Sequence, residues 1–240
     1  MMVRSDISQG YALAPNSGKD RGGGPRGAPN SAAPQKKAAI QRNGVRIIGG
    51  AWRGRRIRFP PGPELRPTPD RVRETVFNWL QGVIADARCL DLFAGSGALG
   101  IEALSRGAGE AVFVEQDRAA ADALTGTLAS LQATRGQVVR ADVFQYLSRP
   151  PRPYDVVFLD PPFAQGRLAE LCTLLEVRGW LAARAFIYLE ARARDSVAPL
   201  PPSWEAVRQT RAGEVHGVLA RRSRAAAAAT ATSDQGTGRT

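Results

Sequence analysis

The stretch FLDPPFAQG, residues 158–166, ends an apolar run with a carboxylate, two prolines and a phenylalanine. A strand that ends there holds Asp160 at its carboxyl end, where open α/β sheets bind their ligands. Proline has a fixed φ and restricts the preceding residue to extended conformations. The two prolines therefore fix the direction of the neighbouring hydrogen-bond acceptors without a flexible loop having to become ordered. The motif therefore predicts a pair of acceptors, the Asp160 carboxylate and the Pro161 carbonyl.

Such acceptors suit the exocyclic amine of a nucleobase, which is a poor nucleophile because its lone pair is delocalised into the ring. Two acceptors on its N–H groups favour tetrahedral geometry and turn the lone pair toward a methyl donor. A flat Phe163 ring adds stacking on the base, which contributes about 1–3 kcal/mol. The predicted catalytic residues are Asp160, Pro161, Pro162 and Phe163.

A glycine-rich loop, DLFAGSGALG at residues 91–100, carries a second chemical signal. It matches the GxGxxG pattern that is shared with dinucleotide-binding folds. Asp91 in front of the loop would repel a pyrophosphate but attracts an ammonium group, which argues against NAD. Glu115 follows at about the 20-residue spacing at which an acid binds ribose hydroxyls. The ligand that suits both acids is S-adenosyl-L-methionine.

The remaining cofactor contacts are predicted from the same loop and from the end of the next strand. Asp142 is placed to accept from the adenine amino group, and Val143 and Phe144 supply apolar contact. The predicted cofactor-binding residues are Asp91, Phe93, Ala94, Gly95, Ser96, Gly97, Glu115, Asp142 and Val143.

The elements that must position these residues alternate between short apolar runs and helical patterns from Arg88 onward. Strands that alternate with helices imply a parallel sheet with right-handed crossovers. Residues 204–222 instead read as two strands around a glycine turn. The expected fold class is therefore α/β and Rossmann-like, with a mostly parallel sheet and a C-terminal antiparallel hairpin.

A helix is predicted over residues 69–84, ahead of this sheet. Its apolar side chains Val72, Val76, Phe77 and Leu80 lie close to one face at helical spacing. Asp70 stands near the start of the helix, where a capping residue is expected.

The net charge of +11 is carried by the flanks of the chain, because residues 76–220 hold fourteen arginines and sixteen acidic residues. Residues 43–82 combine arginines with strand-like runs, so these side chains are expected on a folded surface. Neutralising phosphates releases counterions, and the segment therefore predicts nucleic-acid contact. The predicted RNA-binding residues are Arg53, Arg55, Arg56, Arg66, Arg71 and Arg73.

These patterns predict four parts of the chain. Residues 1–42 form a disordered basic arm, 43–82 an arginine-rich segment for RNA contact, 83–222 the catalytic domain, and 223–240 a disordered alanine-rich tail. The two cysteines show neither metal-ligand spacing nor a disulfide framework. No apolar run reaches the roughly 18 residues of a membrane span, and the first residues lack an export signal. We expect a cytoplasmic, metal-free monomer.

Four stretches together resemble the RsmD family of bacterial 16S ribosomal RNA guanine-N2 methyltransferases. They are RIIGGAWRGRRI, LRPTPDRVRETVFNWL, CLDLFAGSGALGIEALSRGA and VFLDPPF. The resemblance runs from about Arg46 to Leu219, and its first two motifs are the more specific. It implies a seven-stranded class I methyltransferase fold, S-adenosyl-L-methionine as donor, and one guanine near the P site as acceptor. It also implies action on 30S particles or their assembly intermediates, with ribosomal proteins as partners.

Other functions share parts of this pattern. The DPPF motif also suits an amino-methyltransferase that acts on adenine N6 in DNA or on a protein glutamine, and only the arginine-rich segment favours RNA. A dinucleotide-dependent oxidoreductase is disfavoured by Asp91 and DPPF. The intact Asp160 argues against an RNA-binding protein that has lost catalysis.

Overall fold

The computed structural model describes residues 44–59, 68–161, 167–193 and 199–223 of the 240-residue chain. The predicted N-terminal arm and nearly all of the predicted tail lie outside these ranges. So do three predicted site residues, Arg66, Pro162 and Phe163. All described residues belong to one unit, Gln35–Thr240.

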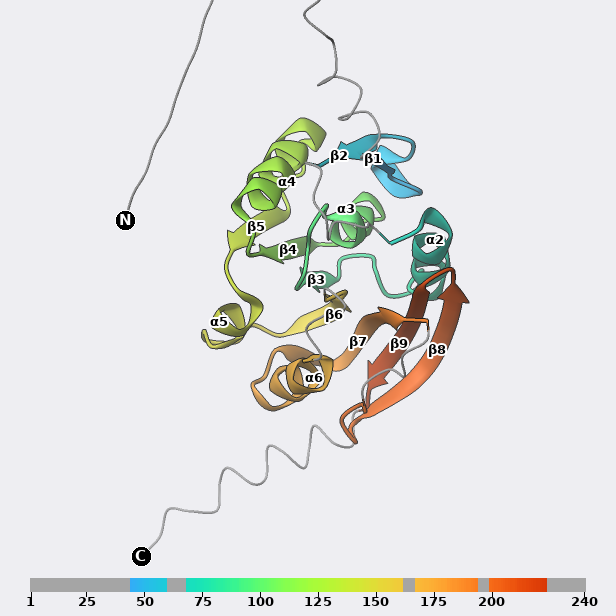
Figure 1. Cartoon of the computed structure of the whole chain (residues 1–240), viewed down its shortest axis with the longest axis vertical. Helices are drawn as coiled ribbons and strands as arrows, with labels where there is room; N and C mark the ends of the chain where they lie inside the picture. The colour runs from blue at the N-terminus through green and yellow to red at the C-terminus, as the bar shows by residue number, and fades with distance from the viewer. Residues whose placement is uncertain (1–43, 60–67, 162–166, 194–198, 224–240) are drawn as a thin grey trace, which may run out of the picture. The chain divides into compact units, whose positions relative to one another are not determined.

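A seven-stranded sheet with the order β5-β4-β3-β6-β7-β9-β8 forms the centre of the fold (Figure 1). The strands are β3 Arg88–Asp91, β4 Glu110–Glu115, β5 Gly136–Arg140, β6 Tyr154–Leu159, β7 Leu181–Arg192, β8 Trp204–Ala212 and β9 Val215–Arg222. Strands β3 to β7 pair in parallel, whereas β9 is antiparallel to both of its neighbours. The predicted α/β fold with its C-terminal hairpin is confirmed.

Helices cover both faces of this sheet, as the two buried apolar clusters show. One cluster joins α2 Asp70–Trp79, α3 Ala98–Ser105 and α4 Arg118–Leu131 to one face. The other joins α5 Val143–Leu147 and α6 Leu168–Val177 to the opposite face. Side chains alternate along each strand, so Phe158 enters the first cluster and Leu159 the second. In the part of the chain that the structure describes, no helix has the length and apolar character needed to cross a bilayer.

The arginine-rich segment forms a small hairpin outside the main sheet. Strand β1, Gly44–Arg46, pairs antiparallel with β2, Arg56–Arg58, and the 3-10 helix η1, Gly50–Trp52, lies between them. Val45 and Ile57 of this hairpin are buried in the same cluster as α2 and α3. The described part of residues 43–82 therefore shares its hydrophobic core with the sheet.

Helix α2 ends at Trp79 and is therefore shorter than the helix predicted over residues 69–84. The predicted apolar face is confirmed, since Val72, Val76, Phe77 and Leu80 are all buried. The expected cap at Asp70 is wrong: Pro69 occupies the cap position, and Asp70 is the first helical residue. Its Oδ1 accepts from Arg73 Nη2 at 2.7 Å instead.

A buried carboxylate on α3 ties the hairpin to the sheet. The side-chain oxygens of Glu102 accept from the backbone N–H groups of Ile48 and Gly49, each at 2.8 Å. They also accept from Arg106 Nε at 2.7 Å. Arg73 Nη1 lies 3.6 Å from Glu102 Oε2, and neither of these two side chains is exposed.

The burial of Arg73 contradicts the prediction that it contacts RNA. Its guanidinium donates to the carbonyl oxygens of Arg46 at 2.8 Å and Thr68 at 3.2 Å. Arg73 stands three, four and seven residues before Val76, Phe77 and Leu80, so helical geometry places it on the inward face of α2. The basic composition of the segment concealed this structural role.

We predict that Glu102→Ala lowers the free energy of unfolding by about 3–5 kcal/mol. The substitution removes the buried carboxylate beside the Arg73 guanidinium, which among the described residues keeps only the exposed Asp70 as an acidic partner, and it leaves the backbone N–H groups of Ile48 and Gly49 without their acceptor. Denaturant unfolding monitored by circular dichroism measures the change. The control is Glu74→Ala, which removes an exposed glutamate from α2 and should cost less than about 0.5 kcal/mol. Equal effects of the two substitutions would contradict a central role for Glu102.

Candidate active site

Two of the predicted acids meet at one edge of the sheet. Asp91 ends β3 and Asp160 follows β6, and these parallel strands are neighbours in which Asp91 lies opposite Phe158. The chain builds β4 and β5 on one side of β3 and then returns to place β6 on the other side. This reversal of strand order is where open α/β sheets bind ligands. The two acids therefore occupy the position expected of a ligand site.

A third acid, Glu190, was missed by the sequence reasoning. It lies on β7, where the pairing of Leu159 with Leu189 makes Glu190 the neighbour of Asp160. Glu190 is buried, and its Oε1 accepts from Tyr188 Oη at 2.9 Å. The available signal was the run RAFIYLEA, which ends an apolar strand in an acid just as β3, β4 and β6 do.

Thr68 also belongs to the site, and no local pattern indicated it. It is buried just before α2, and its Oγ1 lies 3.5 Å from Asp160 Oδ2. Its carbonyl oxygen accepts from the buried Arg73. The arginine-rich segment thus reaches the acids through a polar side chain.

Burial makes these acids hard to ionise. The pKa of Asp91 rises to about 7 through burial and the charges of Asp160 and Glu115, although the Gly100 N–H lowers it. Burial likewise raises the pKa of Asp160 to about 7, while hydrogen bonds from Thr68 and Glu190 lower it. The pKa of Glu190 is raised well above its usual range, first by burial and then by the Asp160 charge. A cationic ligand is favoured in such surroundings.

The glycine loop wraps around the end of β3. Gly95 and Gly97 adopt left-handed conformations, with φ of 50° and 75°. The Gly95 N–H donates to Glu115 Oε2 at 2.7 Å, and the Gly100 N–H donates to Asp91 Oδ2 at 3.0 Å. Asp91 and Glu115, two of the three acids predicted to bind the cofactor, therefore also hold the loop in place.

The other predicted cofactor residues differ in how much surface they offer. Asp142 is exposed and caps α5, because its Oδ1 accepts from the N–H groups of Phe144 and Gln145. Val143 is buried in the cluster beneath α5, which leaves its side chain little surface for a ligand. Within the loop, Phe93 is partly exposed, whereas Ala94 and Ser96 are buried.

The predicted RNA-binding arginines of the hairpin, Arg53, Arg55 and Arg56, lie away from the acids, whereas Arg71 follows Thr68 by three residues at the start of α2. Arg53, Arg56 and Arg71 are exposed, and Arg55 donates to the Ser130 carbonyl in the last turn of α4 at 2.8 Å. The Trp52 N–H donates to Ser105 Oγ in the last turn of α3. Helices α3 and α4 both start at the edge of the sheet that carries Asp91 and Asp160, which we call the acid edge. At 1.5 Å per residue, the lengths of these helices place the turn that carries Arg53 and Arg55 about 12–21 Å from the acid edge.

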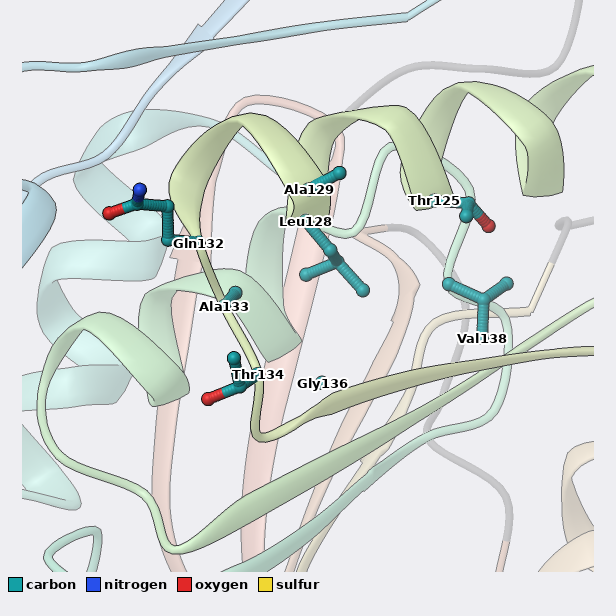
Figure 2. Close-up of a pocket in the computed structure, with 8 residues that line it drawn as sticks. All are labelled: Thr125, Leu128, Ala129, Gln132, Ala133, Thr134, Gly136 and Val138. Atoms are coloured by element: carbon teal, nitrogen blue, oxygen red, sulfur yellow. The ribbon is translucent and has the colours of Figure 1, made fainter.

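A separate hollow of about 670 Å³ lies between α4 and the edge strand β5 (Figure 2). Its lining residues are Thr125, Leu128, Ala129, Gln132, Ala133, Thr134, Gly136 and Val138. None of these carries a titratable side chain, so this hollow offers no group for proton transfer.

Known proteins resemble this chain over most of its length. The family described as "Conserved hypothetical protein 95" matches residues 45–221. Ribosomal RNA small subunit methyltransferase D of Escherichia coli K12 is 50% identical over 171 residues, 71% of this chain and 86% of that protein. The protein of the same name from Haemophilus influenzae is 41% identical over 175 residues, 71% of this chain and 90% of the relative.

A solved structure agrees with this similarity. The putative methyltransferase yhhF from Escherichia coli superposes with a TM-score of 0.70 and is 47% identical. The match covers 76% of this chain and 99% of that one.

The glycine loop yields a stability prediction. Gly97→Ala should lower the free energy of unfolding by about 1–2 kcal/mol, because alanine disfavours a left-handed φ and its Cβ would clash with Leu124 Cδ1. Thermal unfolding measures the change. Gly126→Ala is the matched control, since Gly126 lies within α4 with open space around it and should gain about 0.5–1 kcal/mol. A change of the free energy of unfolding in the same direction for both substitutions would contradict the assigned role of Gly97 in the loop.

Proposed function

This chain belongs to the RsmD family, described as Conserved hypothetical protein 95, and on that premise we propose that it methylates the exocyclic N2 of a guanine in 16S ribosomal RNA. More coarsely, it is a ribosomal RNA methyltransferase. The observation that carries the proposal is the position of Asp160 and Pro161 beside Asp91, where the order of the strands reverses.

The acid edge fits S-adenosyl-L-methionine better than a dinucleotide. Asp91 is almost fully buried, and the charges that act on it come from Asp160 and Glu115, both acidic. A pyrophosphate there would add further negative charge, whereas an ammonium and a sulfonium would relieve the repulsion. When bound, this cofactor supplies an activated methyl group. Asp91 would hold its ammonium, Glu115 its ribose hydroxyls and Asp142 its adenine amino group.

Asp160 and Pro161 act on the acceptor base. The Asp160 carboxylate and the Pro161 carbonyl accept from the two N–H bonds of the amine and orient its lone pair. With a pKa of about 7, Asp160 can also take the proton that the amine loses, because a general base works best near the ambient pH. The buried Thr68 lies against Asp160, with its Oγ1 3.5 Å from Asp160 Oδ2.

The position of the arginines favours a large anionic acceptor. A single nucleoside at the acid edge cannot reach the exposed hairpin arginines Arg53 and Arg56, about 12–21 Å away along the helices, whereas a folded RNA can contact both regions. The two curated relatives are named as small-subunit ribosomal RNA methyltransferases. We therefore assign the substrate as 16S RNA in the 30S particle or its assembly intermediates, where ribosomal proteins are neighbours of the monomeric enzyme.

The experiment that tests the proposal supplies labelled S-adenosyl-L-methionine to the protein together with 30S particles that lack the modification. Free 16S RNA, DNA and protein serve as parallel acceptors, and nucleoside analysis identifies the product. N2-methylguanine from the particle is the expected outcome. Label found only in DNA or protein would overturn the substrate.

Asp160→Ala should reduce methyl transfer to background, because the amine loses an oriented acceptor and its base. Cofactor binding, measured by calorimetry, should change only a few-fold. The control Asp122→Ala removes an exposed aspartate from α4 and should leave both quantities unchanged. Strong residual turnover in Asp160→Ala would exclude the assigned role.

Replacing Arg53 and Arg56 with alanine should weaken RNA binding and flatten its salt dependence. If each arginine contacts one phosphate, the slope of log K against log salt becomes shallower by about 1.4–1.8. The control replaces Arg178 and Arg184, which are exposed near the end of α6 and the start of β7. Helix α6 packs on the face of the sheet opposite the hairpin. Equal slopes for the two double variants would show that the hairpin arginines are not RNA contacts.

A further inference from the structure

The mechanism above uses Asp160 but leaves its neighbour Glu190 without a task. An acid of this kind is rarely buried without a partner or a function. Glu190 is 2% exposed, whereas Asp160 keeps part of its surface open. A role for Glu190 must therefore act through Asp160, not by direct contact with the base.

We propose that Glu190 is a positioning residue for the transfer reaction: it keeps a proton and donates it in a hydrogen bond to Asp160, which holds Asp160 ionised and aimed at the amine. This inference rests on the proposed function, and it assigns a task to a residue that neither the sequence motifs nor the names of the relatives indicate.

The geometry supports this arrangement from both sides of the pair. Strand alternation puts Asp160 and Glu190 on the face that carries Phe158 and Tyr188. Glu190 is hydrogen-bonded to Asp160, and its Oε1 accepts from Tyr188 Oη at 2.9 Å. Thr68 Oγ1 lies 3.5 Å from Asp160 Oδ2, and its hydroxyl also hydrogen-bonds to Glu190. Hydroxyl donors thus reach both carboxyls, and the contact between the two carboxyls needs one proton.

Burial and the neighbouring acids disfavour a second negative charge on Glu190, and they outweigh the hydrogen bonds from Thr68 and Tyr188, which lower its pKa. Asp160 faces it from β6 and Asp91 from β3, and both raise its pKa. On its own strand the Tyr188 hydroxyl is neutral, and from β9 the opposing residue is Gly217, which has no side chain. A Cβ at Gly217 would collide with the Tyr188 hydroxyl, so this glycine makes room for the donor to Glu190.

The two acids differ in which of them can carry the charge. Two carboxyls in contact in a buried site share a proton, because both cannot ionise without strong repulsion. The charge is less costly on Asp160, which keeps part of its surface open, than on the enclosed Glu190. Asp160 therefore ionises as the pH rises through about 7, and Glu190 loses its proton only at higher pH. Activity should rise with the first step and fall with the second.

Two variants separate positioning from packing. Glu190→Gln keeps an N–H donor for Asp160 and an oxygen for Tyr188, so kcat on the ribosomal particle should stay near the wild-type value while the fall at alkaline pH disappears. Glu190→Ala removes the donor and should lower kcat about 10- to 100-fold with KM little changed. Cofactor binding and thermal unfolding check that both variants are folded.

Infrared spectroscopy tests the location of the proton without any turnover. At pH 8, above the pKa of about 7 of both Asp91 and Asp160, the wild type should show the C=O band of a buried protonated carboxyl. The band should vanish in Glu190→Gln and persist in Asp160→Asn. The reverse result would place the proton on Asp160 and overturn the proposal.

The activity data distinguish two failures. If the wild type methylates RNA and Glu190→Gln either keeps the alkaline fall or loses as much activity as Glu190→Ala, then Glu190 does not position Asp160 and the proposed function still stands. If the wild type transfers no methyl group to any RNA, the proposed function fails, and the infrared result alone decides which acid holds the proton.

Discussion

The buried ion pair between Arg73 and Glu102 joins the parts of the molecule that form the site. Glu102 holds the backbone of the hairpin against α3, and Arg73 holds the carbonyl of Thr68. Thr68 in turn lies against Asp160. A buried ion pair is costly to desolvate and is stable only when further hydrogen bonds satisfy both groups. Here those hydrogen bonds come from segments far apart in the sequence, so the pair also fixes how the segments meet.

The buried acids of the site destabilise the ligand-free protein at neutral pH, whereas the Arg73–Glu102 pair helps to hold it together. Asp91 and Asp160 keep protons in the folded chain up to pH about 7, whereas in the unfolded chain they lose them near pH 4. The unfolded state binds fewer protons between these values, so the free energy of unfolding decreases as the pH rises through that window. A cationic ligand relieves the same repulsion. The site thus gains affinity for such a ligand from an arrangement that destabilises the ligand-free protein.

In the proposed function, chemistry and substrate contact are divided between two regions. The acids lie where the strands end, while the exposed arginines of the hairpin lie near the far ends of α3 and α4. Helices and sheet share buried clusters, so the spacing between the regions is set by packed elements and not by a linker. Such spacing selects an acceptor by its size and its phosphate positions as well as by the base that enters the site. A folded RNA satisfies both requirements, whereas a free nucleoside satisfies only one.

The sequence by itself predicted the alternation of strands with helices, the glycine loop, and the acids Asp91 and Asp160 at strand ends. These features could be predicted because periodicity, glycine conformation and strand termination are local properties. The inward position of Arg73 follows from its helical spacing, but the basic composition of the segment concealed it. Two features depended on the tertiary structure: the contact of Glu190 with Asp160 and the place of Thr68. The first follows from the order of strands in the sheet, and the second from how α2 packs on α3. Hydrophobic burial decides both by bringing distant segments together, and no pattern within one segment records which partner it will meet.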